Sequence, residues 1–143
     1  MTATMTDIHV GARWTSTPYL LDDASASRYG KAIESPVRKS PRRGIHDDRH
    51  AARAAGFSAP IAAGEQTIAV IAQFLADKFE MHFLRGGRID IALTKAVFFG
   101  DKLTSHVEVE RIEGSRAMLL IRVDNQRGES VMTGSAAITV ADA

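Results

Sequence analysis

The part of the sequence that decides the fold is residues 44–64, which read GIHDDRHAARAAGFSAPIAAG. Asp47 or Asp48 can accept hydrogen bonds from the first backbone N–H groups of a short helix that begins directly after them. Gly56 can end that helix, because glycine readily adopts the left-handed conformation that closes a helix. Gly64 then stands where a second helix begins, so the stretch predicts two helices joined by a bend.

A longer helix is expected over residues 65–79. Its apolar residues recur with helical spacing: Ile68, Ile71, Ala72, Leu75 and Phe79. Further apolar residues widen this stripe until it nearly surrounds the helix: Ala69, Val70 and Phe74. A helix that is apolar on nearly all sides is mostly buried, so we expect it at the centre of the domain.

From Arg88 onward, apolar and polar residues alternate with the period of two that is typical of β-strands. The alternation occurs in four runs, at residues 89–94, 106–110, 119–124 and 137–140. Turn-forming residues separate these runs: Gly100-Asp101, Glu113-Gly114-Ser115 and Gln126-Arg127-Gly128. The pattern predicts an α+β fold in which about four antiparallel strands wrap around the central helix.

The N-terminal part is less regular. Residues 1–10 are expected to form a flexible arm, and residues 11–143 are expected to form one domain. Trp14 and the run 19–21 indicate a first strand, and Asp22 or Asp23 can cap a helix over residues 24–33. An irregular loop is expected over residues 34–44, which contain two prolines and a glycine.

Composition excludes several classes of protein. The formal net charge is +1, so no overall field favours nucleic acid or a membrane surface. No segment approaches the roughly 20 consecutive apolar residues of a membrane span. The sequence has no cysteine, which excludes disulfides and thiolate metal sites and suits a reducing cytoplasm. The histidines show no metal-ligand spacing, so we expect neither a metal nor another cofactor.

Two motifs resemble those of the MaoC-like hydratases and dehydratases. One is the 44–64 stretch, with Ile45, His46 and Asp48, then an alanine-rich short helix, then Pro60-Ile61 and Gly64. The other is the run 96–101, Ala-Val-Phe-Phe-Gly-Asp, which is similar to the family's Pro-Val-x-x-Gly-Asp turn with alanine in place of proline. The resemblance covers nearly the whole chain in the order of elements.

This resemblance implies a single hot-dog domain, an antiparallel sheet wrapped around a central helix. It further implies a homodimer or higher homo-oligomer that joins its sheets, with an acyl-CoA or acyl-carrier thioester in a tunnel at the interface. The implied reaction adds or removes water across an enoyl double bond with an Asp–His pair. The implied protein is therefore a cytoplasmic hydro-lyase that needs no cofactor.

The sequence departs from the family at the catalytic aspartate. The family's aspartate precedes the histidine by five residues, and that position here is Pro41. If the loop contains an insertion, the aspartate aligns instead with Ser35, directly after Glu34. Neither alignment supplies the carboxylate, so a different acid, a different reaction or no reaction remains possible.

His46 is the candidate general base, since a neutral imidazole can take a proton from water or from carbon near neutral pH. Glu65 can replace the missing aspartate as its partner, or it can be a helix N-terminal acid that the dipole favours. The backbone N–H of Gly64 is a candidate oxyanion donor, with Ala63 and Arg43 as further substrate contacts. Arg43 belongs to a basic cluster that can bind an anion or simply face solvent: Arg38, Lys39, Arg42 and Arg43.

Three functions therefore compete. The first is a hydratase or dehydratase of enoyl or 3-hydroxyacyl thioesters, with His46 as base. The second keeps the tunnel but catalyses isomerisation, elimination or cyclisation on a substrate without CoA. The third is a non-catalytic hot-dog subunit that stabilises a heterodimer or binds an acyl group.

Overall fold

A computed structural model describes residues 1–32 and 44–140 of the chain. Its centre is a six-stranded antiparallel sheet, in which the strands lie in the order β1-β4-β5-β6-β3 and β2 pairs separately with β4. The strands are β1 (Arg13–Thr15), β2 (Tyr19–Leu20), β3 (Arg88–Leu93), β4 (Lys102–Glu113), β5 (Arg116–Asp124) and β6 (Ser130–Thr139).

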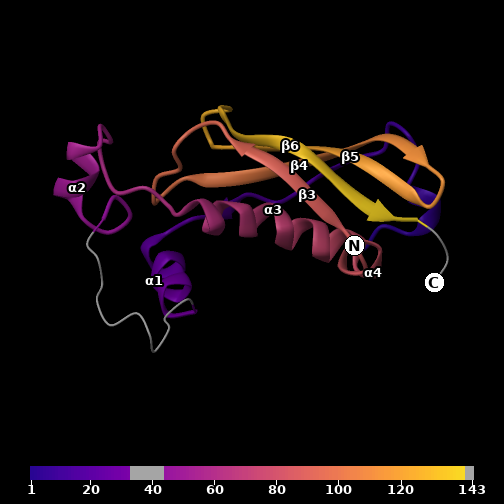
Figure 1. Ribbon diagram of the computed structural model, residues 1–143, viewed down its shortest axis with the longest axis horizontal. Helices are drawn as coiled ribbons and strands as arrows, with labels where there is room; N and C mark the ends of the chain where they lie inside the picture. The colour runs from indigo at the N-terminus through magenta and orange to yellow at the C-terminus, as the bar shows by residue number, and fades with distance from the viewer. Residues whose placement is uncertain (33–43, 141–143) are drawn as a thin grey trace.

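One long helix lies along one face of this sheet (Figure 1). The helices are η1 (Met5–Asp7, a 3-10 turn), α1 (Asp23–Ala32), α2 (Arg49–Ala54), α3 (Gly64–Phe79) and α4 (Met81–Leu84). The long helix is α3, and α1 and α2 lie near its N-terminal end (Figure 1). Ile71, Leu75 and Phe79 of α3 are fully buried, and the Phe79 ring meets Trp14 edge to face at 5.1 Å. The helix and its helical period are therefore as the sequence predicts, but only one side of α3 is buried, since Ala69, Gln73 and Asp77 on the opposite side are exposed.

The sheet presents its apolar residues to α3 because they occupy every second position of each strand. On β5 these residues are Ala117, Leu119, Ile121 and Val123, and all are buried. On β4 the inward series is Leu103, Ser105, Val107 and Val109, so a serine interrupts an otherwise apolar row. This arrangement confirms the predicted α+β hot-dog fold, an antiparallel sheet around a central helix.

Two features differ from the sequence-based expectation. The short helix α4 follows α3 after Glu80, whose φ of 44° breaks the helical path. Four residues are too few to show a helical period, so the sequence pattern did not reveal α4. Within residues 1–10, Ala3 and Ile8 are buried, and the Ala3 N–H donates to the Lys78 carbonyl oxygen at 2.8 Å. These contacts attach the expected arm to the end of α3.

Strand β3 ends the sheet on one side, and within the described part of the chain it pairs only with β6. Its last residue, Leu93, is 48% exposed. An edge strand presents unpaired backbone N–H and C=O groups, so it is a place where another strand can add. Among residues 1–32 and 44–140, no helix is long and apolar enough to cross a membrane.

Candidate functional site

His46 lies in the turn that precedes α2, where the chain runs beside the segment leading into α3. The Ile61 N–H donates to the Ile45 carbonyl oxygen at 3.0 Å, and His46 Nδ1 donates to the Ile61 carbonyl oxygen at 2.9 Å. A carbonyl oxygen can only accept, so Nδ1 holds the proton and the neutral ring leaves its lone pair on Nε2. The His46 side chain is exposed, so Nε2 can meet a substrate.

The start of α3 offers backbone donors close to this turn. Ala63 is the N-cap, and its carbonyl oxygen accepts from the N–H groups of Gln66 at 3.0 Å and Thr67 at 3.2 Å. No described residue accepts from the Gly64 N–H, and no side chain caps the helix. The unpaired N–H groups lie at the positive end of the helix dipole, where a carbonyl oxygen that gains negative charge is stabilised.

The exposed end of the edge strand β3 lies beside this helix start. A Cβ atom placed on Gly64 would come within 2.9 Å of Leu93 Cδ1. Leu93 is the last residue of β3 and is exposed. The proposed carbonyl site therefore lies next to the part of the sheet that is open to a second strand.

The segment between His46 and α3 is fixed from its other side. The Ala62 N–H donates to the Val97 carbonyl oxygen at 2.8 Å, and Ile61 forms an isolated β-bridge with Phe98. Ile61, Ala62 and Val97 are buried. The position of the His46 hydrogen bond thus depends on the loop at residues 97–98.

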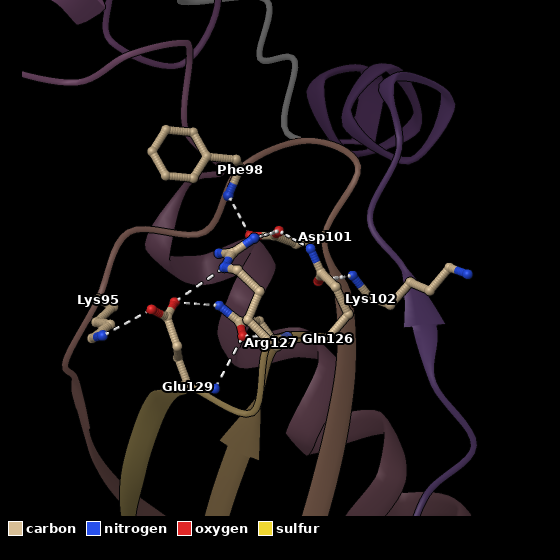
Figure 2. Close-up of polar contacts among 8 residues, drawn as sticks. Lys95, Phe98, Asp101, Lys102, Gln126, Arg127 and Glu129 are labelled. Atoms are coloured by element: carbon tan, nitrogen blue, oxygen red, sulfur yellow. Dashed lines mark hydrogen bonds and ion pairs between the residues drawn. The ribbon is translucent and has the colours of Figure 1, made fainter.

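Asp101 fixes that loop in turn (Figure 2). Its buried carboxylate accepts from the Phe98 N–H at 3.0 Å, from Gln126 Nε2 at 2.8 Å and from Arg127 Nη1 at 3.2 Å. Gly100, before it, has a φ of 101°, a conformation that favours glycine. The Gly100-Asp101 turn therefore connects the β5–β6 turn, through hydrogen bonds of Asp101, to the segment that orients His46.

Glu129 completes this polar cluster on its solvent side. Figure 2 shows its carboxylate between Lys95 and Arg127, at 3.3 Å from Lys95 Nζ and 3.3 Å from Arg127 Nε. The hydrogen bond from the Asn125 side chain, together with those from Lys95 and Arg127, lowers the pKa of Glu129 from 4.5 to about 2. The carboxylate is therefore charged in all but strongly acidic solution.

Glu65 has a different partner from the one that the sequence suggested. The Tyr29 hydroxyl of α1 donates to Glu65 Oε2 at 2.9 Å, and no described residue links Glu65 to the His46 ring. Burial raises the pKa of Tyr29, and the bond to Glu65 raises it further, so Tyr29 stays protonated. The structure thus brings Tyr29 and Glu65 together at the start of α3.

The remaining expected residues divide into two groups. Asp48 caps α2 by accepting from the N–H groups of His50 and Ala51 at 2.8 and 2.9 Å. Arg43 and the rest of the basic cluster lie outside the described residues. Within residues 1–32 and 44–140, no three His, Asp or Glu side chains gather closely enough to hold a metal ion.

The sequence did not indicate a cavity of about 430 Å³ between α1, α3 and the segment 16–21. Its inner lining includes Leu21, Ser25, Gln66 and Ser105, all buried. Gln66, two residues beyond Gly64, is the first residue of α3 that lines it, and neither Gly64 nor His46 does. The one sequence signal was Ser105, a polar residue at an inward position of a strand.

Solved structures with this fold include several hydratases. The chain is 20% identical to an (R)-hydratase of A. caviae involved in PHA biosynthesis, with a TM-score of 0.72 over 94% of this chain and 98% of that one. It is 22% identical to the R-hydratase PhaJ1 of Pseudomonas aeruginosa, with a TM-score of 0.73 over 97% and 86%. It is 15% identical to a chain of the C-terminally truncated HadBC complex, a (3R)-hydroxyacyl-ACP dehydratase of Mycobacterium tuberculosis, with a TM-score of 0.64 over 97% and 100%.

These likenesses define the class of fold: a hot-dog domain, with an antiparallel sheet around one central helix. Residues 43–130, more than half of the chain, match the MaoC like domain. The chain therefore belongs to the MaoC-like hydratase and dehydratase family. Comparison with curated proteins gave no match.

Proposed function

We propose that this protein hydrates enoyl thioesters or dehydrates 3-hydroxyacyl thioesters, with His46 as the general base. The observation that supports this most directly is the bond from His46 Nδ1 to the Ile61 carbonyl oxygen, which directs the lone pair to Nε2. Ile61 lies three residues before Gly64, so one short segment both accepts the His46 hydrogen bond and carries the unpaired helix amide. Family membership and the hydratases among the similar structures point to the same reaction.

In the hydration direction, the thioester carbonyl accepts a hydrogen bond from the Gly64 N–H. This bond draws electron density from the double bond and stabilises the enolate that forms as water adds. His46 Nε2 takes one proton from water while the water oxygen bonds to the β carbon. A second proton then reaches the α carbon, and loss of the proton on His46 restores the neutral ring.

Glu65 is the proposed source of that second proton. Its Oε2 accepts from Tyr29, which stays protonated, so Tyr29 holds the carboxyl group in place. The proton that Glu65 gives to the α carbon is replaced from solvent, where the proton that His46 took from water is released. A Glu65→Gln variant should reduce turnover, and Tyr29→Phe should reduce it less because the carboxyl group remains. If Glu65→Gln were as active as the wild type, Glu65 would have no part in proton transfer and would only stabilise the N-terminus of the helix.

The acyl group of the substrate is proposed to occupy the cavity that Gln66 lines. Ala63, at the N-cap, and Arg43 are proposed as further substrate contacts, Arg43 through the anionic part of CoA or of a carrier protein. A second copy of the chain, joined at β3 next to Leu93, would close the site from outside. The active form is therefore proposed to be a homodimer.

A second candidate is a subunit that contributes little or no catalysis to a larger complex. Two observations favour it: neither alignable position holds the family's aspartate, and Glu65 bonds Tyr29 rather than His46. One of the similar structures is itself a two-component dehydratase complex. A site with one histidine can also catalyse isomerisation, elimination or cyclisation on a substrate without CoA.

The test is a spectrophotometric assay of the purified full-length chain. Crotonyl-CoA and longer enoyl-CoAs are offered, and loss of the enoyl absorbance is followed. Turnover by the chain alone supports the proposed reaction. No turnover alone, but turnover after addition of a second hot-dog subunit, supports the subunit function, and no turnover in either case contradicts the proposal.

A further inference from the structure

Ser105 has a buried hydroxyl group to which no residue of the described ranges, 1–32 and 44–140, forms a hydrogen bond. It lies on β4 with no exposed surface, between Leu103 and Val107 in the row of side chains that face α3. Its backbone groups are paired, since the Ser105 N–H donates to Ser16 Oγ at 2.9 Å and its carbonyl oxygen accepts from the Ser16 N–H at 2.9 Å. The Ser105 Oγ atom itself has no hydrogen-bond partner among the described residues.

Ser105 is one of the residues around the cavity between α1 and α3, and Gln66, a second buried polar residue, lines the same cavity. Gln66 is only 7% exposed, and its side-chain amide forms no hydrogen bond within the described part of the chain. A buried polar group without a partner costs about 1–3 kcal/mol, so native structures rarely retain one without a reason. Among the described residues of the lining, Ser105 Oγ is such a group, and the Gln66 amide can bond a polar atom in the same cavity.

The rest of the lining shows what kind of molecule would fit. Leu21, Val70 and Phe74 form apolar walls, whereas Arg28, Gln73 and Asp77 are exposed at the rim. Small-molecule sites commonly combine apolar walls with a few fixed polar groups that set orientation. A purely hydrocarbon chain would leave Ser105 and Gln66 unpaired when it displaced water.

We propose that the acyl group bound in this cavity has an oxygen substituent, a keto, hydroxyl or ether oxygen, which bonds to Ser105 and Gln66. This inference rests on the proposed function, because it places the thioester carbonyl at Gly64. Gln66 lies two residues further along α3, about 3 Å along the helix axis, and Gln73 lies about 13 Å along it. The substituent would therefore lie on the acyl chain beyond the reacting carbons.

The test uses saturated thioesters, which bind but cannot be hydrated. Hexanoyl-N-acetylcysteamine and its 4-oxo and 5-oxo derivatives are titrated into the full chain by calorimetry. At least one oxo derivative should bind about 5- to 10-fold more tightly than the plain chain, which corresponds to one net hydrogen bond. Equal affinities for all three thioesters would overturn the proposal.

Ser105→Ala is the diagnostic variant, and Ser25→Ala is its matched control. Ser25 is also buried at this cavity, but its hydroxyl already bonds Asp22 Oδ1 at 2.6 Å. The Ser105→Ala variant should bind the oxo and plain thioesters with similar affinities. Its affinity for the plain thioester should be at least as high as that of the wild type. Ser25→Ala should retain the preference. A preference that persists in Ser105→Ala would contradict the proposal.

A final arm separates failure of this inference from failure of the proposed function. Hexan-2-one, which has no thioester, is added while the backbone amide signals of Ser105 and Gln66 are followed by NMR. Shifts in the wild type that Ser105→Ala abolishes would support the polar subsite even if no enoyl thioester is turned over. If neither the ketone nor any thioester shifts these signals, the cavity holds water only and the proposal is wrong.

Discussion

A single hydrogen bond determines which nitrogen of His46 can act as a base. Because the Ile61 carbonyl oxygen can only accept, it keeps the proton on Nδ1 and leaves Nε2 for the substrate. Tyr29 has a similar effect on Glu65, since it donates to one carboxylate oxygen and stays protonated itself. In both cases a partner from another segment orients a side chain that we propose to be reactive.

Glu129 gives a prediction at the same scale. Its pKa is about 2 in the folded protein against 4.5 ordinarily, so its charged form stabilises the fold above pH 4.5. That contribution is lost as the pH falls from 4.5 toward 2, because the carboxylate is then protonated in the folded state as well. Glu129→Gln should therefore lower the urea midpoint of unfolding at pH 7, and the difference from wild type should shrink through this range.

Glu113→Gln serves as the control for this experiment. Glu113 is an exposed strand-end residue that pairs with Arg111, so its removal should change the urea midpoint little. A Glu129→Gln difference that stayed constant from pH 7 to pH 3 would show that the charge of Glu129 does not stabilise the fold.

Some of these residues could be found from the sequence and others could not. His46 and Gly64 stand in one stretch of local pattern, so the sequence placed both as candidates. The Tyr29–Glu65 bond joins residues that are 36 positions apart, and Ser105 lines a cavity with residues of α1 and α3. Such contacts depend on how distant elements pack, which residue spacing within one element does not specify.

At the scale of elements, three short segments meet before α3. The turn at His46, the segment 61–62 and the loop 97–98 are joined by backbone hydrogen bonds, and Asp101 anchors the last of them to the β5–β6 turn. The sequence motif contained the Gly100-Asp101 pair, but only the fold reveals that Gln126 and Arg127 donate to it.

Asp101→Ala should therefore destabilise the protein. The substitution removes the buried carboxylate that accepts from the Phe98 N–H and that ties the exposed side chains of Gln126 and Arg127 to this loop. The expected loss is about 2–4 kcal/mol of unfolding free energy, measured by urea denaturation.

Asp23→Asn is the comparison for this loss. Asp23 is exposed in the first turn of α1, so its replacement should cost less than about 1 kcal/mol. If Asp101→Ala were no more harmful than Asp23→Asn, the polar cluster in Figure 2 would not fix the loop before α3.

At the scale of elements, the sequence predicted the central helix and the four later strands because each has a clear period. It did not reveal α4, whose four residues are too short for a period. The sequence also did not reveal how residues 1–10 pack. Of their described side chains, two apolar ones, Ala3 and Ile8, are buried in the core, and two residues are too few to form a pattern.

At the scale of the whole molecule, the open edge of the sheet is the main unexplained surface. Strand β3 ends the sheet, and its exposed Leu93 lies beside the start of α3. A dimer formed by joining two β3 strands would pair the free backbone groups and cover the proposed site.

The dimer can be tested by light scattering. The wild-type mass should be twice the 15.5 kDa of one chain, and Leu93→Glu should shift it toward one chain because a charge would be buried at the joint. Leu120→Glu is the matched control, since Leu120 is 45% exposed on β5, away from the β3 edge. Dissociation by Leu120→Glu alone would place the interface elsewhere.

The most direct test of the central claim is the rate of enoyl-CoA hydration by His46→Ala compared with His50→Ala. His50 is exposed on α2, four residues from His46, and has no proposed part in the reaction. His46→Ala should lose at least about 100-fold in turnover, as expected for removal of a general base, while His50→Ala stays near the wild-type rate. Equal rates for the wild type and His46→Ala would contradict the claim that this imidazole is the base.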